Sequence, residues 1–212
     1  MNKNIPALLL ALLLAVSLVG CGKQEEYFQS GHISARTYEN PLLGLQCIVP
    51  ADWEFLTESE LLQLSKVVLT EEGGEKDVQL TAHLQSGGNV QDMYVRTEDG
   101  LQSINVMVRK FDPETQAPDM AGFADLGMKE VEQVYRSMGI TAVVTGREQV
   151  LFLDEQCEAI RLGGAYEDVP LYSLQLCLLR GEYVCVVTFT SYVEDNTEMM
   201  MKFFHPLIAE EQ

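Results

Sequence analysis

The sequence predicts an α+β fold, in which helices pack on an antiparallel β-sheet. Two hairpin signals and one long amphipathic helix carry this prediction. Gly181-Glu182 and Asp99-Gly100 are two-residue turns, each between runs of alternating apolar and polar residues. After Asp119, apolar residues recur every three or four positions, which is the pattern of a helix with one buried face. Because turns this short join antiparallel strands, the sheet should be antiparallel.

A strand and a buried tryptophan are expected near the start of the folded part. Residues 42–49 alternate between apolar and polar side chains and stop at Pro50, as a short strand does. Trp53 is the only tryptophan of the chain. Its position just after this strand favours a place in the core, under the first helix, over an exposed binding platform.

Two helices are expected next. Thr57 and Glu60 form a capping box, in which each side chain can bond the other residue's backbone N–H, so a helix should run to about Leu69. Residues 76–86 fit either a helix or a strand. The four-residue spacing of two leucines and the glycine pair that follows favour the helix.

The first hairpin should join residues 92–97 to residues 101–111. The Asp-Gly turn between them fixes the register, because the loop has only two residues. This register places Val95 opposite Ile104 and Met93 opposite Val106.

The clearest helix begins after Asp119, a good capping residue, and ends at Gly139. Its apolar stripe consists of Met120, Phe123, Gly127, Val131, Val134 and Met138. We expect this stripe to pack against the sheet rather than to bind a ligand.

Five more strands and a closing helix should follow. The strands are predicted over residues 140–145, 148–153, 157–162, 171–180 and 183–192, with a loop over residues 163–170. The last two strands should pair Leu178 with Cys185, Leu176 with Val187 and Leu174 with Phe189, which makes one face apolar throughout. The closing helix should begin at Asp195, with Glu198 in its first turn, and run through Phe203 and Phe204 to Pro206.

The register of the last hairpin also separates two cysteines. Cys177 and Cys185 should point to opposite faces of the sheet and therefore not bond to each other. Cys47 alternates with core residues and is expected as a buried free thiol. We favour no disulfide, although the pattern leaves bridges between Cys47 and Cys185 or between Cys157 and Cys177 open.

The opening and the end of this predicted domain resemble the Mog1/PsbP-like group. The resemblance rests on Tyr38-x-Asn40, Leu43-Gly44, Pro50-x-x-Trp53 and the segment from Gly181 to Thr190. It spans about residues 38–208 and implies a sheet with helices in α/β/α layers. The roles within this group differ, so the resemblance implies a fold and no function.

The amino end resembles the signal segment of bacterial lipoproteins. An apolar stretch over residues 5–19 is too short to span a bilayer comfortably and ends in Leu18-Val19-Gly20-Cys21, which is similar to a lipobox. The resemblance implies that residues 1–20 are removed and that Cys21 carries a diacylglyceryl group, which anchors the chain outside the cytoplasm. Residues 21–36 then read as a flexible tether, and residues 37–212 as a single α+β domain. In size and layout the chain also resembles small Firmicute lipoproteins of unassigned role.

The charge balance argues against a nucleic-acid partner. The formal net charge is −18 and becomes −19 once the leader, whose only charged residue is Lys3, is removed. Phosphate binding needs a basic patch, and the sequence contains no cluster of Lys and Arg.

No catalytic or metal-binding motif stands out. The histidines His32, His83 and His205 are far apart and fit no metal motif, and neither a nucleophile elbow nor a phosphate loop is present. Adjacent acidic residues such as Asp154 and Glu155 are expected by chance in a chain that contains 32 Asp and Glu residues. We therefore expect no enzyme, no cofactor and no metal.

The sequence thus favours a lipid-anchored binding protein that supports a protein partner at the cell envelope. Binding residues tend to lie in loops, and Tyr166, Glu167 and Asp168 mark the first loop to test. One alternative is a small-ligand carrier with a groove between sheet and helices. The other is a hydrolase of wall material, which would need two convergent carboxylates in a deep cleft.

Overall fold

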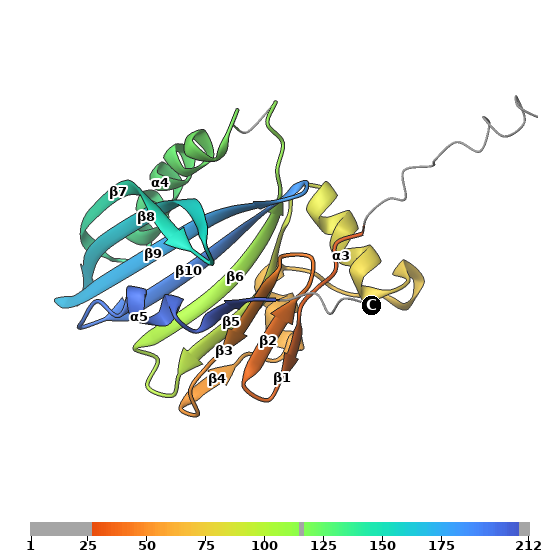
Figure 1. Cartoon of the computed structure of the whole chain (residues 1–212), viewed down its shortest axis with the longest axis horizontal. Coiled ribbons are helices and arrows are strands. Elements are labelled where there is room, and N and C mark those ends of the chain that lie inside the picture. The colour runs from red at the N-terminus through yellow and green to blue at the C-terminus, as the bar shows by residue number, and fades with distance from the viewer. Residues whose placement is uncertain (1–26, 115–116, 208–212) are drawn as a thin grey trace, which may run out of the picture.

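The computed structural model describes residues 27–114 and 117–207 of the chain (Figure 1). The larger sheet has the order β4 (Trp53–Phe55), β5 (Asn89–Thr97), β6 (Gln102–Lys110), β10 (Tyr183–Tyr192), β9 (Val169–Arg180), β8 (Glu155–Tyr166) and β7 (Thr141–Phe152). The smaller sheet has the order β1 (His32–Ser34), β2 (Thr37–Asn40), β3 (Leu45–Ile48) and β11 (Phe204–Pro206). The helices are α2 (Glu58–Ser65), α3 (Lys76–Gln85), α4 (Met120–Ser137) and α5 (Thr197–Met201), with a 3₁₀ turn over Glu71–Gly73.

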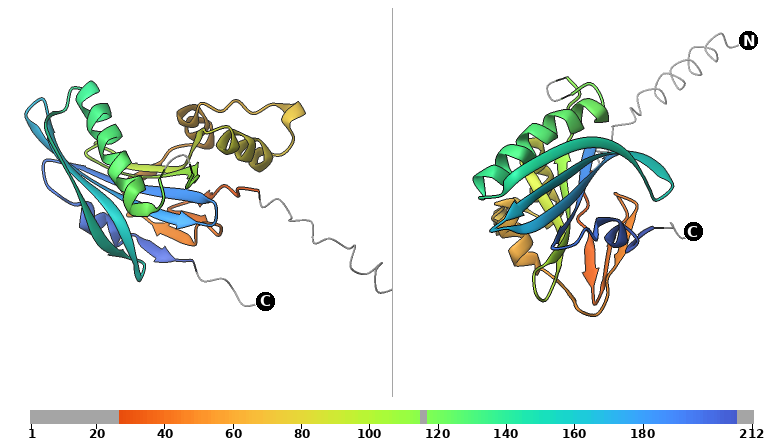
Figure 2. Two further views of the ribbon diagram at one scale, coloured as in Figure 1. Left: turned by 90° about the horizontal axis from the view of Figure 1, so that it is seen from above. Right: turned by 90° about the vertical axis from the view of Figure 1, so that its left-hand side faces the viewer.

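Antiparallel sheets with helices packed on them confirm the predicted α+β class. Figure 2 shows α4 on one face of the larger sheet and the smaller sheet on the other. The alternation along β10 explains this arrangement: Cys185, Val187 and Phe189 enter the main core shared with the smaller sheet, whereas Val184 and Val186 pack with Phe123 of α4. The smaller sheet had not been expected, because its strands have three or four residues each and come from both ends of the chain.

Both predicted hairpins are confirmed in register. Val95 pairs with Ile104, Met93 with Val106, and Leu178, Leu176 and Leu174 pair with Cys185, Val187 and Phe189. A bulge between Gln91 and Met93 interrupts β5, which the alternation had not revealed. Because Cys177 and Cys185 belong to different clusters on the two faces, they cannot bond to each other. The four cysteines of the described region are free and buried.

The helices in the first part of the chain are confirmed, with one shorter than expected. The capping box between Thr57 and Glu60 is formed, but α2 ends at Ser65 because Lys66 adopts a left-handed conformation. Residues 76–85 form the helix α3. Trp53 is buried as expected, with its ring edge-on to Phe203, 5.5 Å between centroids.

Asp119 caps α4 as predicted, through a 2.8 Å bond from the N–H of Gly122. The apolar stripe is only partly buried: Phe123 packs on the sheet, while Val134 and Met138 are exposed. Periodicity predicts which residues share a helix face, but it does not tell how far the surface beneath the helix extends.

Three predictions for the second half of the chain are wrong. The strands expected over 140–145 and 148–153 form one strand, β7, and the loop expected over 163–170 does not exist. β8 continues to Tyr166, and only Glu167 and Asp168, both with positive φ, connect it to β9. Within this segment a Cβ on Gly164 would lie 2.7 Å from Ile140, so this glycine permits close packing and does not mark a turn. The closing helix is a single turn, after which Phe204 enters the smaller sheet beside Cys47.

The prediction of a flexible tether is wrong for residues 27–36. Phe28 is fully buried, and β1 pairs with β2. The leader and Cys21 lie outside the described residues. Among the helices that are described, none has the length and apolar character needed to cross a bilayer.

Candidate functional site

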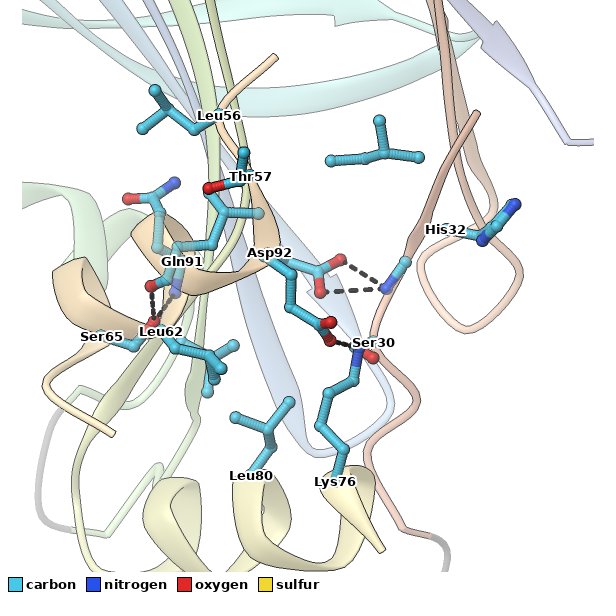
Figure 3. Close-up of a pocket in the computed structure, with 15 residues that line it drawn as sticks. Ser30, His32, Leu56, Thr57, Leu62, Ser65, Lys76, Leu80, Gln91 and Asp92 are labelled. Atoms are coloured by element: carbon cyan, nitrogen blue, oxygen red, sulfur yellow. Dashed lines mark hydrogen bonds and ion pairs between the residues drawn. The ribbon is translucent and has the colours of Figure 1, made fainter. Parts of the chain in front are cut away.

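A groove of about 490 Å³ lies between the N-terminal segment, α2, α3 and β5 (Figure 3). Leucine and valine side chains form its apolar part: Leu56, Leu61, Leu62, Leu80 and Val90. Its polar groups come from Ser30, His32, Thr57, Glu58, Ser65, Lys76, Gln91 and Asp92. The volume lies in the range of about 300–1,000 Å³ that is typical of small-molecule sites, and the lining mixes apolar and polar groups.

The wall formed by α2 is fixed to β5 by Ser65. Its hydroxyl donates to the carbonyl of Leu61 at 2.8 Å and accepts the N–H of Gln91 at 2.8 Å. Gln91 lies next to the bulge of β5, and the serine provides an acceptor on α2 for its backbone N–H. Leu61 and Leu62 are thereby held facing the groove.

The mouth of the groove is bridged by one ion pair. Lys76, the first residue of α3, places its Nζ 2.7 Å from Oε1 of Glu58, the first residue of α2. The pair is partly exposed, so it contributes little to stability, about 0–1 kcal/mol. The pair spans the gap between the first residues of the two helices at the entrance.

Asp92 lies at the floor of the groove and is 5% exposed. Its carboxylate accepts the N–H of Gly31 at 3.0 Å to each oxygen, the hydroxyl of Tyr38 at 2.6 Å and the side-chain amide of Asn40 at 2.8 Å. Burial raises the pKa of Asp92, while these hydrogen bonds act in the opposite direction. Through these bonds Asp92 connects β2 and the residue before β1 to β5. Because its acceptor sites are occupied, its carboxylate is poorly placed for proton transfer.

The N-terminal segment forms the third wall. The N–H of Phe28 donates to Oγ1 of Thr81 at 2.9 Å, and the hydroxyl of Ser30 donates to Asp77 at 2.7 Å. Both acceptors lie on α3, so the chain is bound along this helix before it reaches Asp92. We call residues 28–31, with these bonds, the N-terminal latch.

Both carboxylates that line the groove are engaged by neighbouring groups. Glu58 is paired with Lys76, and the carboxylate of Asp92 is surrounded by donors. Within the described ranges, no three His, Cys, Asp or Glu residues come close enough to hold a metal ion. The three histidines lie on different elements, β1, α3 and β11.

Comparisons with known proteins give a distant likeness of fold. The solution structure of the cyanobacterial PsbP, CyanoP, from Synechocystis sp. PCC 6803 is 13% identical over 90% of this chain and 99% of that chain, with a TM-score of 0.48. LpqN of Mycobacterium tuberculosis, described as involved in cell envelope biogenesis, is 10% identical over 75% of this chain and 76% of that chain, with a TM-score of 0.34. No protein-family model and no curated protein matches the chain. At this level of similarity neither protein's role transfers to this chain.

The residues singled out from the sequence lie elsewhere. Tyr166, Glu167 and Asp168 form the tip of the β8–β9 hairpin, at the other end of the larger sheet, and Cys21 lies outside the described residues. The sequence analysis missed Asp92 and Phe28. Two features of the sequence could have indicated them: Asp92 is a carboxylate within an alternating apolar strand, and Phe28 belongs to a Tyr-Phe pair within a polar segment.

A second hollow of about 520 Å³ lies between β7 and α5. Its main cation, Arg161, is already bound to Glu148 at 2.7 Å and to Asp195 at 3.4 Å. This hollow is also more open to solvent than the groove beside the N-terminal latch, so we regard that groove as the stronger candidate site.

Proposed function

We propose that this chain is a lipid-anchored, extracytoplasmic binding protein that takes a small, partly apolar ligand into the groove between α2, α3 and β5. The observation that carries this proposal is the groove itself, which has the volume of a small-molecule site and a lining in which apolar side chains and polar groups are mixed. The anchor at Cys21 is supported by the lipobox-like sequence at the end of the apolar leader.

The character of the ligand follows from the lining. Leu62 and Leu80 extend into the groove from the two helices, as Figure 3 shows, and would contact an apolar body. Lys76 and Glu58 at the mouth would orient a polar end, since their charges are partly exposed. Both carboxylates that line the groove are bound to neighbouring groups, which supports binding over acid–base chemistry.

A second candidate function is recognition of a protein partner at the β8–β9 tip. Tyr166 there is 43% exposed, and the turn that follows holds two non-glycine residues at positive φ. A side chain of this kind on a protruding tip is a common element of protein interfaces. Positive φ at both positions is the geometry of a two-residue hairpin turn, which places the exposed tyrosine beside the tip.

One pair of variants tests the first candidate, with the full-length protein as the sample. Leu62→Trp fills the groove, and Leu64→Trp adds the same ring to the exposed side of α2. A small-molecule screen by thermal shift should find ligands that raise the melting temperature of the wild type and of Leu64→Trp but not of Leu62→Trp. Equal shifts in all three proteins would refute the groove as the binding site.

Leu62→Trp and a third variant, Tyr166→Ala, distinguish the two candidates when proteins are captured from membranes. If Tyr166→Ala abolishes capture of a partner and Leu62→Trp does not, the β8–β9 tip is the functional surface. The opposite pattern places recognition at the groove.

A further inference from the structure

We propose that the domain is held with its α3 end next to the lipid surface, so that the groove opens near the membrane and the β8–β9 tip lies away from it. The lipid surface is thus the nearest neighbour of the α3 end, which is held there by the short tether and not by adsorption. This inference rests on the proposed anchor at Cys21 and concerns where that anchor places the groove.

The first step is the short distance along the chain between the anchor and the fold. Phe28 is fully buried, and its N–H is bound to Thr81 of α3, so the chain is fixed from this residue onward. Only six residues separate Cys21 from Phe28. Seven steps of an extended chain span at most about 25 Å. The sixteen-residue tether expected from the sequence would have reached about twice as far, and would have left the domain free to turn.

The second step is which end of the fold this fixes. The ring of Phe28 packs edge-on against Tyr183, 5.7 Å between centroids. Tyr183 begins β10 and pairs with Arg180, the last residue of β9. The latch therefore lies at the end of the sheet where β9 finishes.

The β8–β9 tip lies at the opposite end, because it precedes the first residue of β9, Val169. Eleven steps along this strand correspond to about 36 Å. Figure 1 shows the two ends of β9 far apart, with α3 beside the end that leads into β10. A tether shorter than this strand holds the latch and the groove close to the lipid, while the tip lies farther away on average.

The third step is that the chain length, and not charge, imposes this placement. The residues beside the latch include the exposed Glu71, Glu72 and Glu75, and the whole chain is strongly acidic. Such a surface is repelled by anionic lipid rather than adsorbed to it. Lengthening the tether should therefore be enough to release the α3 end from the membrane.

Energy transfer from the protein to labelled lipid headgroups tests this placement. The full-length lipidated protein is reconstituted into phosphatidylcholine vesicles that carry an acceptor on the headgroup. Gln85→Cys on α3 and Asp168→Cys at the β8–β9 tip each carry the donor, and both positions are exposed. The four native thiols of the domain are buried, so the label should go to the introduced cysteine.

We expect transfer from position 85 to be several-fold more efficient than from position 168. Inserting ten Gly and Ser residues after Gly22 should reduce the signal at position 85 toward that at position 168. Equal transfer from both positions in vesicle-bound protein would overturn the placement while leaving the anchor intact. Protein that does not float with the vesicles would overturn the anchor and, with it, this inference.

Discussion

Phe28→Ala should lower the free energy of unfolding by about 3 kcal/mol, the lower end of the range for removing a buried aromatic ring. Phe28 is fully buried in the main core and packs on Tyr183, so its loss leaves a cavity under the N-terminal latch. A residue in a flexible tether would give no change. Urea denaturation of the full-length protein, followed by circular dichroism, measures the difference.

Tyr27→Ala is the matched control for this prediction. Tyr27 directly precedes Phe28 and is 48% exposed, so its replacement should change stability by no more than about 0.5 kcal/mol. A small effect in both variants would show that the domain begins after this segment.

Asp92→Ala should lower the free energy of unfolding by a similar amount, about 3 kcal/mol, for a different reason. The carboxylate is almost fully buried and accepts hydrogen bonds from Gly31, Tyr38 and Asn40. Its removal leaves these donors without their acceptor, and each buried unsatisfied group costs about 1–3 kcal/mol. Some of this cost is offset, because the variant no longer buries a charge.

A double-mutant cycle separates this network from a general loss of packing. Tyr38→Phe alone should cost about 1 kcal/mol, since it removes one hydrogen bond to Asp92. In the Asp92→Ala background the same change should cost almost nothing, because the bond is already lost. Additive effects would contradict a direct role of the Tyr38–Asp92 bond in holding the latch.

Local signals account for the parts of the fold that the sequence predicted well. The two hairpins depend on turns of two residues, so their registers follow from the chain within about ten positions. The capping box of α2 and the Asp119 cap of α4 are equally local. The core register of Leu176 with Val187 followed from the same reasoning.

The errors arise where the structure depends on distant contacts. Residues 27–36 are polar enough to look like a linker, yet Phe28 and Gly31 bind Thr81 and Asp92, which lie 53 and 61 positions away. The smaller sheet brings β11 beside β3, a pairing that no local pattern encodes. The loop predicted over residues 163–170 is wrong because spacing does not show that Ile140 packs against Gly164.

The candidate groove could not be predicted for the same reason. Its walls come from the N-terminal segment, two helices and a strand, and the bulge at Gln91 that receives Ser65 breaks the alternation of β5. The carrier alternative expects a groove between sheet and helices, and the candidate groove lies between two helices and β5 of the larger sheet. The location of the groove depends on the N-terminal latch, and the sequence predicts a flexible tether for the residues that form this latch.

The most direct test of the account is mass spectrometry of the native protein extracted from membranes. The account expects a chain that begins at Cys21 and carries a diacylglyceryl group on that residue, because the leader ends in a lipobox-like sequence. A chain that keeps residues 1–20, or a mature chain without lipid, would contradict both the anchor and the placement of the groove at the membrane.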